Sequence, residues 1–176
     1  MRKSMGLLLP ALLVYGALAF AGPAAGAGSP AGANPEYQPL AFLAEHCWKG
    51  AFPGGKQTDE HCFSWIYGGK FLRDRHTVRA EGKPDALGES IYLWNGSAGQ
   101  LEYLYIESDG GFSRGPVAVD KDALVFPETS FVENGKTMVY RSRWQRSGAD
   151  SYDVLTEFQA KDGWVPGFKV HMAQVP

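Results

Sequence analysis

The chemistry that this sequence could support centres on two histidines that a hairpin would bring together. His61 and His76 lie on either side of Gly68-Gly69, which fits a two-residue hairpin turn. In that register His61 faces His76, on the side of the hairpin that carries the large aromatic residues. With Asp74 or His46 nearby, the two imidazoles would complete a set of three ligands of the kind that zinc accepts.

The same cluster has two other interpretations. The histidines could be hydrogen-bonded core residues beside Trp48, because no short ligand spacing such as His-x-His or Cys-x-x-Cys accompanies them. Together with an acid, they could also serve a metal-dependent or histidine-dependent hydrolase or isomerase. No residue is assigned a catalytic role, since carboxylates such as Glu107 and Glu157 are expected to pair with arginines.

The two cysteines of the chain, Cys47 and Cys62, are expected to form a disulfide bond. The segment Pro53-Gly54-Gly55-Lys56 fits a four-residue loop, and in the resulting register Cys47 faces Cys62 while Trp48 faces His61. Directly opposed residues of antiparallel strands have Cα atoms about 4.5–5.5 Å apart, which a disulfide can span. In an exported chain such a pair should oxidise, so neither thiol is expected to act as a nucleophile.

The N-terminus has the three parts of an export signal. Arg2 and Lys3 give a positive start, the apolar run Gly6–Phe20 follows, and Ala25-Gly26-Ala27 fits a cleavage site between small residues. The run is shorter than the ~20 residues that span a bilayer, although an uncleaved anchor helix is the alternative. We therefore predict a signal peptide over residues 1–27, a flexible leader over 28–38, a barrel domain over 39–176, and a secreted or periplasmic protein.

Beyond the leader, apolar and polar residues alternate with a period of two between turn residues, as strands and hairpins do. The pattern predicts an all-β domain: one antiparallel meander of about 8–10 strands that closes into a barrel, preceded by a short helix over Pro39–His46. A flat sandwich is the alternative. The predicted strands are His46–Phe52, Asp59–Tyr67, Lys70–Arg79, Gly88–Asn95, Gln100–Ser108, Gly111–Val119, Ala123–Phe126, Thr137–Gln145, Ser151–Ala160 and Trp164–Met172.

The composition favours a ligand-binding interior over a nucleic-acid surface. The formal net charge is −2 and no basic run occurs, which argues against nucleic acid as a partner, and no stable membrane insertion is expected after signal cleavage. The aromatic content of 13% could either fill the barrel or line a cavity for a small hydrophobic or amphipathic molecule. The residues predicted to contact such a ligand are Trp48, His61, Trp65, His76, Trp94, Tyr103, Tyr105 and Arg141.

Two segments resemble known barrels. LAEHCWKGAF (Leu43–Phe52) looks like the helix-then-strand entry of calycin barrels, in which a tryptophan, here Trp48, closes the floor. CFSWIYGGKFLRDRH (Cys62–His76) is similar to a hairpin of uncharacterised bacterial secreted proteins with a lipocalin-like domain of unknown function. The resemblance implies a small barrel with an internal cavity. In related barrels that resemble nitrobindin, a histidine near the last strand binds haem iron, and His171 has a comparable place.

The sequence thus predicts a secreted small-molecule-binding barrel rather than an enzyme. No cofactor is predicted from the residues alone. The alternatives are a metal at His61 and His76, and a haem at His171 as the resemblance implies.

Overall fold

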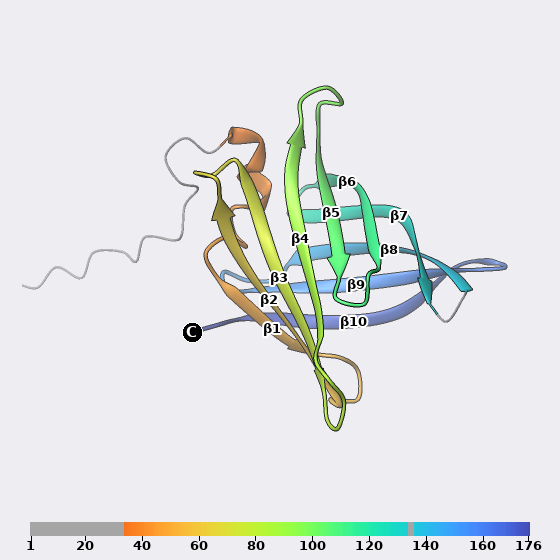
Figure 1. Cartoon of the computed structure of the whole chain (residues 1–176). Helices are drawn as coiled ribbons and strands as arrows, with labels where there is room; N and C mark the ends of the chain where they lie inside the picture. Colours follow the sequence, from red (N-terminus) through yellow and green to blue (C-terminus); the bar gives the residue numbers. More distant parts are fainter. Residues whose placement is uncertain (1–33, 134–135) are drawn as a thin grey trace, which may run out of the picture.

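The computed structural model describes residues 34–133 and 136–176. The predicted signal peptide and the beginning of the predicted leader lie outside the described residues. The described chain forms one 3₁₀ helix and ten strands (Figure 1). They are η1 (Pro35–Leu40), β1 (Cys47–Ala51), β2 (Gln57–Ile66), β3 (Phe71–Ala80), β4 (Ala86–Asn95), β5 (Gln100–Glu107), β6 (Phe112–Asp120), β7 (Ala123–Glu133), β8 (Lys136–Arg146), β9 (Ser151–Ala160) and β10 (Gly163–Val175).

The strands form a closed antiparallel barrel in which each strand pairs with its neighbours in sequence. The last strand, β10, closes the barrel on β1, with Trp48 opposite Gln174. The predicted meander barrel is therefore confirmed, and the sandwich is not formed. In the view of Figure 1, β2 to β5 run steeply while β7 to β10 cross them nearly horizontally, so the interior lies between two crossing groups of strands.

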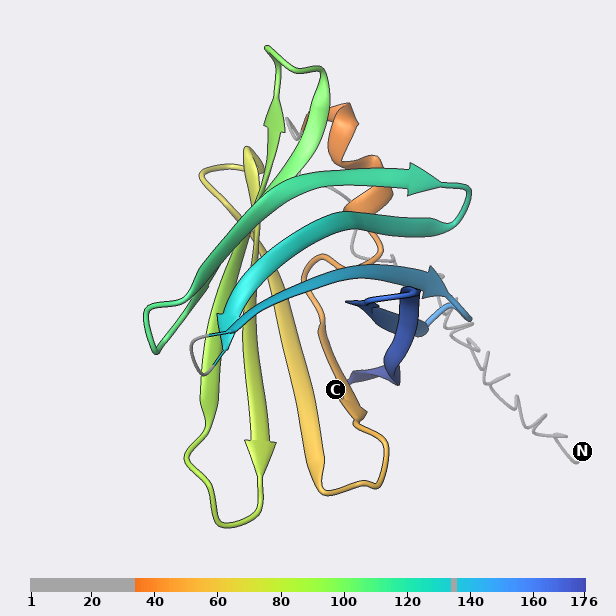
Figure 2. The ribbon, with the colours of Figure 1, turned by 90° about the vertical axis from the view of Figure 1, so that its right-hand side faces the viewer.

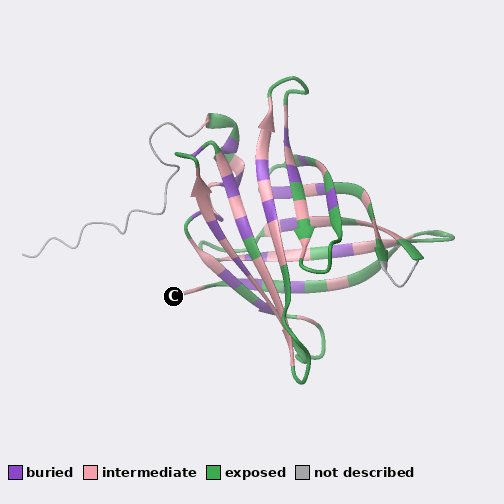
Figure 3. Ribbon diagram, viewed as in Figure 1, coloured by how far each residue is buried: buried purple, intermediate pink, exposed green. Residues whose placement is uncertain are grey.

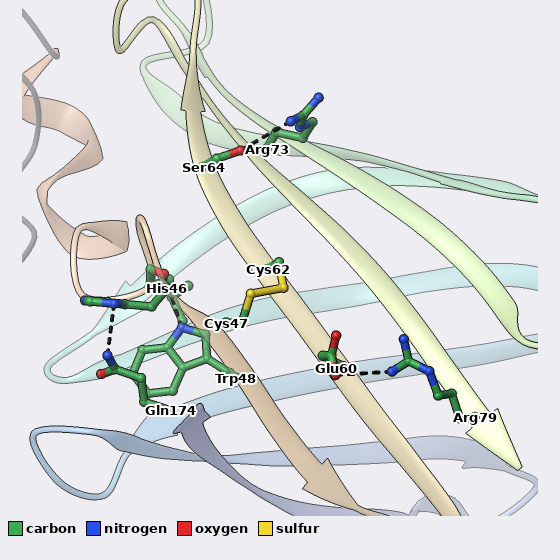
Figure 4. The surroundings of a disulfide bond; sticks show 10 residues. His46, Cys47, Trp48, Glu60, Cys62, Ser64, Arg73, Arg79 and Gln174 are labelled. Carbon is green, nitrogen blue, oxygen red and sulfur yellow. Dashed lines mark hydrogen bonds and ion pairs between the residues drawn. A yellow bond between two sulfur atoms is a disulfide. The ribbon is translucent and has the colours of Figure 1, made fainter. Parts of the chain in front are cut away.

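The registers predicted for the first two hairpins are confirmed. Cys47 lies opposite Cys62, His61 lies opposite His76, and the two cysteines form a disulfide bond between β1 and β2 (Figure 4). Since side chains alternate between the faces of a strand, the disulfide at Cys62 faces outward and His61 faces inward. In the same way, the buried residues of these strands occur at every second position, with intermediate residues between them (Figure 3).

The short helix begins earlier than the sequence pattern predicted. Asn34 caps η1 by accepting a hydrogen bond from the Glu36 N–H at 3.1 Å, and Pro35 occupies the first helical position. This Asn-Pro pair is a helix-start signal that the apolar spacing at Pro39–His46 obscured. Residues 41–45 form turns rather than a further helix. None of the described helices is long and apolar enough to cross a membrane.

The helix and the turns after it pack against one end of the barrel (Figure 2). Trp48 is fully buried there, and its indole N–H donates to the Leu43 carbonyl at 3.1 Å. The Tyr37 hydroxyl donates to the Lys70 carbonyl at 2.7 Å and accepts from the Trp94 N–H at 2.9 Å. These bonds attach the helix and the turns after it to β1, β4 and the β2–β3 turn. The helix therefore covers this end of the barrel, and the interior space lies further along the barrel axis.

Candidate functional site

A cavity of about 290 Å³ lies inside the barrel between the two crossing groups of strands. Its walls differ in chemistry. The polar wall is formed by residues of β2 to β6, namely Asp59, His61, Asp74, His76, Ser90, Tyr103, Tyr105, Glu107 and Ser113. The opposite wall, from β7 to β10, is mostly aromatic and aliphatic and contains Phe126, Phe131, Tyr140, Trp144, Val154, Phe158, Phe168 and Val170, together with the polar residues Ser142 and Thr156. Phe112 of β6 also lines the cavity.

Five titratable side chains in the polar wall form one chain of contacts. The His61 Nδ1 atom is 2.7 Å from the Asp74 carboxylate, and its Nε2 atom is 3.3 Å from Asp59 Oδ2. The second oxygen of Asp59 is 2.7 Å from His76 Nε2, while His76 Nδ1 is 3.3 Å from the Tyr105 hydroxyl. The two imidazole rings stack with centroids 4.3 Å apart and planes 10° from parallel. Asp59 therefore lies between the Nε2 atoms of both histidines.

The contact between Asp59 and His76 is close but poorly directed. Although Asp59 Oδ1 and His76 Nε2 are 2.7 Å apart, they do not align as a hydrogen bond, and both atoms are buried without any other partner. The two atoms are close enough to form an ion pair, but the angle between them does not allow a hydrogen bond. Buried polar atoms without a hydrogen-bond partner reduce the stability of a folded protein. A further group that interacted with both of these atoms would therefore be favoured here.

The two carboxylates stabilise positive charge on the histidine between them. Burial alone would lower the pKa of His61, but the charge of Asp74 and the hydrogen bonds to Asp74 and Asp59 outweigh it and raise the pKa to about 10. Burial would likewise raise the pKa of Asp59, but the close contacts of its carboxylate with the imidazoles of His61 and His76 hold it well below its ordinary range. The cluster is therefore an environment that favours a cation.

Strand periodicity explains why these groups meet. Asp59 and His61 are two residues apart on β2, and Asp74 and His76 are two residues apart on β3, so all four project from the same face. Sequence reasoning placed His61 beside His76 correctly and named Asp74 as a neighbour. Asp59 was not named as a partner, although its position two residues before His61 was a sufficient signal. His46 lies elsewhere and contacts the Gln174 amide at 2.9 Å.

Of the remaining predicted ligand residues, Tyr103 and Tyr105 line the cavity. The three tryptophans Trp48, Trp65 and Trp94 do not. Each belongs to the end of the barrel that η1 covers: the Trp48 indole bonds to Leu43, the Trp65 ring packs against Tyr37, and the backbone N–H of Trp94 donates to the Tyr37 hydroxyl. The sequence pattern could not predict this location. Alternation shows which face of a strand a side chain lies on, but not where along the barrel axis it lies.

Arg141 and His171 face away from the cavity. Arg141 pairs with Glu157 at 2.6 Å on the outer surface, and its guanidinium lies 4.5 Å from the centre of the Trp164 ring. His171 contacts Asp153 at 2.7 Å, and its side chain is 61% exposed because Val170 is the residue of β10 that points inward. The structure therefore places His171 outside the cavity in which a haem would be held.

One lining residue has a sequence context that suggests catalysis. Ser113 is the central residue of the run Gly111–Gly115, which matches the Gly-x-Ser-x-Gly pattern of hydrolase nucleophiles. That pattern requires a turn from a strand into a helix, whereas Ser113 lies within β6. No histidine or carboxylate among the described residues bonds to its buried hydroxyl, so no base activates it. Ser113 is a polar lining residue of the cavity.

A second hollow, of about 490 Å³, lies on the outside between η1 and the β6–β7 turn, near Arg146 and Gln174. It is the larger space, but the buried histidine–carboxylate cluster belongs to the barrel cavity. No protein-family model matches the chain, and no curated protein matches its sequence. The function is therefore inferred from the chemistry of the cavity.

Proposed function

We propose that this protein is a secreted or periplasmic, calycin-like barrel that binds a small amphipathic molecule in its interior. The observation that carries the proposal is the division of the cavity into a polar wall from β2 to β6 and an aromatic wall from β7 to β10. Its volume of about 290 Å³ is near the lower end of the range typical of small-molecule sites. The disulfide supports an oxidising compartment.

The aromatic wall supplies the apolar part of the binding energy. Trp144 contacts Phe126 with ring centroids 4.8 Å apart, and Phe158 contacts Phe168 at 6.4 Å. These rings are already immobilised by contact with one another, so they lose little side-chain entropy when a ligand covers them. Their apolar surface can therefore contribute to affinity at a small entropic cost. An apolar group of the ligand would lie against this wall.

The polar wall favours an amphipathic ligand over a purely apolar one. Among the described residues, the buried hydroxyl of Ser113 and one buried carboxylate oxygen of Asp74 have no hydrogen-bond partner. A polar group that enters the cavity could bond to these atoms. A ligand with a hydrogen-bonding group at one end would therefore bind better than its hydrocarbon analogue.

A hydrolase or isomerase built on His61 and His76 has less support. Both ring nitrogens of His61 contact carboxylates, Nδ1 at 2.7 Å from Asp74 and Nε2 at 3.3 Å from Asp59, so neither nitrogen is free to take a proton from a molecule in the cavity. Ser113 has no activating partner, and both cysteines are in the disulfide. The cluster is better suited to holding charge than to transferring protons.

The proposal is tested by titrating the purified protein with a neutral amphipathic probe, a dimethylaminonaphthalene ketone, whose fluorescence rises in apolar surroundings. We expect saturable binding at one site per chain. Ser113→Leu adds bulk inside the cavity without removing a hydrogen bond and should weaken binding at least tenfold. Ala118→Leu adds the same kind of bulk on the outer face of β6 and should leave binding unchanged. Equal affinity of the two variants would refute the proposal.

Native mass spectrometry of the protein purified from its own source would identify the natural ligand. We expect a non-covalent small molecule that is lost on denaturation and absent from Ser113→Leu. A wild-type protein that remains empty and also fails to bind the probe would contradict the assignment.

A further inference from the structure

The histidine–carboxylate cluster has the donor arrangement of a metal centre. Asp59, His61 and His76 each offer one ligand atom, and these three atoms lie within 4.8 Å of one another. Metal–ligand bonds of about 2.0–2.1 Å at tetrahedral angles place neighbouring donors roughly 3.3 Å apart. The separation of 3.3 Å between Asp59 and His61 meets this value, and small side-chain shifts would bring His76 to it.

The outer contacts of both imidazoles orient them toward a common point. Nδ1 of His61 contacts the buried Asp74 carboxylate at 2.7 Å, and Nδ1 of His76 contacts the Tyr105 hydroxyl at 3.3 Å. Both Nε2 atoms are thereby left to face Asp59. Ligand histidines in metal sites commonly have one ring nitrogen on the metal and the other bonded to a carboxylate or similar group.

The unsatisfied atoms and the local charge favour a cation in this position. A cation between Asp59 Oδ1 and His76 Nε2 would satisfy two buried atoms that otherwise lack a hydrogen bond. The cavity also contains the carboxylates of Asp74 and Glu107, and no lysine or arginine occurs among the described residues that line it. The surroundings are therefore acidic as well as sterically enclosed.

We propose that Asp59, His61 and His76 bind one divalent transition-metal ion through the Asp59 carboxylate and the two Nε2 atoms, with Asp74 and Tyr105 as positioning residues. Binding of the ion at His61 Nε2 releases any proton on that nitrogen to the solvent. Two imidazoles and one carboxylate are ligands that zinc and ferrous iron accept. Three protein ligands leave at least one coordination position for water or for a polar group of a molecule in the cavity. This site is independent of the amphipathic-ligand proposal, because it needs no organic ligand.

The test is a titration of the chelator-treated, purified protein with Co²⁺, followed by its visible absorption, and then by displacement with Zn²⁺ in a calorimeter. We expect one ion per chain. Asp59→Asn keeps the shape of the side chain but removes its charge, and His76→Ala removes a ligand. Each should abolish the Co²⁺ spectrum and weaken binding at least tenfold. Tyr105→Phe should weaken binding roughly tenfold with the spectrum retained.

The matched control is His171→Ala. His171 makes the same 2.7 Å contact with a carboxylate, that of Asp153, but on the exposed face of the barrel. Its loss should leave Co²⁺ affinity unchanged. Thermal unfolding without metal checks that each variant is folded. No stoichiometric uptake by the wild type, or uptake that survives Asp59→Asn, would overturn the site. Ser113→Leu should lose the organic probe and retain Co²⁺, which separates this proposal from the first.

Discussion

His61 and Asp74 are in contact at 2.7 Å inside the barrel, where Asp74 is only 1% exposed. The same type of contact, also 2.7 Å long, joins His171 and Asp153 on the outer surface. The chain therefore contains two matched histidine–aspartate pairs that differ in burial. Substitutions in the two pairs therefore measure how strongly the barrel interior depends on its charged cluster.

Asp74→Asn should destabilise the protein by about 3 kcal/mol, because it leaves a buried imidazolium with less compensation. The value is at the low end of the range for a broken buried pair, since Asp59 still contacts His61. Asp153→Asn should cost about 0–1 kcal/mol, as exposed pairs do. Urea unfolding of both variants measures the difference. Equal losses of stability would contradict the buried role of Asp74.

Reduction of the Cys47–Cys62 disulfide should lower the free energy of unfolding by about 3 kcal/mol. The two residues are 15 apart in sequence, and a crosslink over that distance restricts the unfolded chain by roughly this amount. Denaturant unfolding with and without a reductant measures the effect. The double variant Cys47→Ser/Cys62→Ser should be equally destabilised and insensitive to reductant; an effect of reductant on that variant would point to another cause.

Gly50→Ala should impair the closure of the barrel. A Cβ at this position would lie 2.5 Å from the His171 carbonyl oxygen and 2.5 Å from a methyl group of Val170, both on β10. Overpacking of this kind costs about 1–3 kcal/mol, and here part of the obstruction is backbone that cannot move aside. In Gly96→Ala the nearest atom is 4.0 Å away, so stability should change little. Thermal unfolding compares the two variants.

Alkaline pH should destabilise the cavity through its tyrosines. Burial raises the pKa of Tyr140 to about 12 from an ordinary value of 10.0. Tyr140 therefore loses its proton at a lower pH in the unfolded chain than in the folded protein. Its contribution to the free energy of unfolding is complete below pH 10 and is lost as pH rises through 12. Tyr140→Phe cannot ionise and should retain on the order of 2 kcal/mol more stability than wild type at the alkaline end. Equal pH profiles of the two proteins would contradict the burial of Tyr140.

Local signals predicted the first three strands well, because loop length and alternation fix their register. That was enough to pair Cys47 with Cys62 and His61 with His76. The second half of β7 was missed because Pro127 and a register shift between Phe126 and Thr129 interrupt the alternation.

The aromatic wall of the cavity could not be derived in the same way. Phe126 and Phe158 face Tyr103 and Tyr105 across the barrel only because β10 closes on β1, and this closure depends on contacts between the two ends of the chain. Tryptophans were overvalued as ligand residues for a related reason. The end of the barrel that η1 covers is defined by packing of Tyr37 and Leu43, which no alternation pattern reveals.

The central claim is that a small amphipathic molecule binds between the polar and aromatic walls. A crystal structure of the protein with the dimethylaminonaphthalene ketone probe tests this most directly. The account predicts density for the probe inside the barrel, with its rings against Trp144 and Phe126 and its polar group toward Ser113. Probe density confined to the outer hollow near Arg146, or an interior closed by side chains, would contradict it.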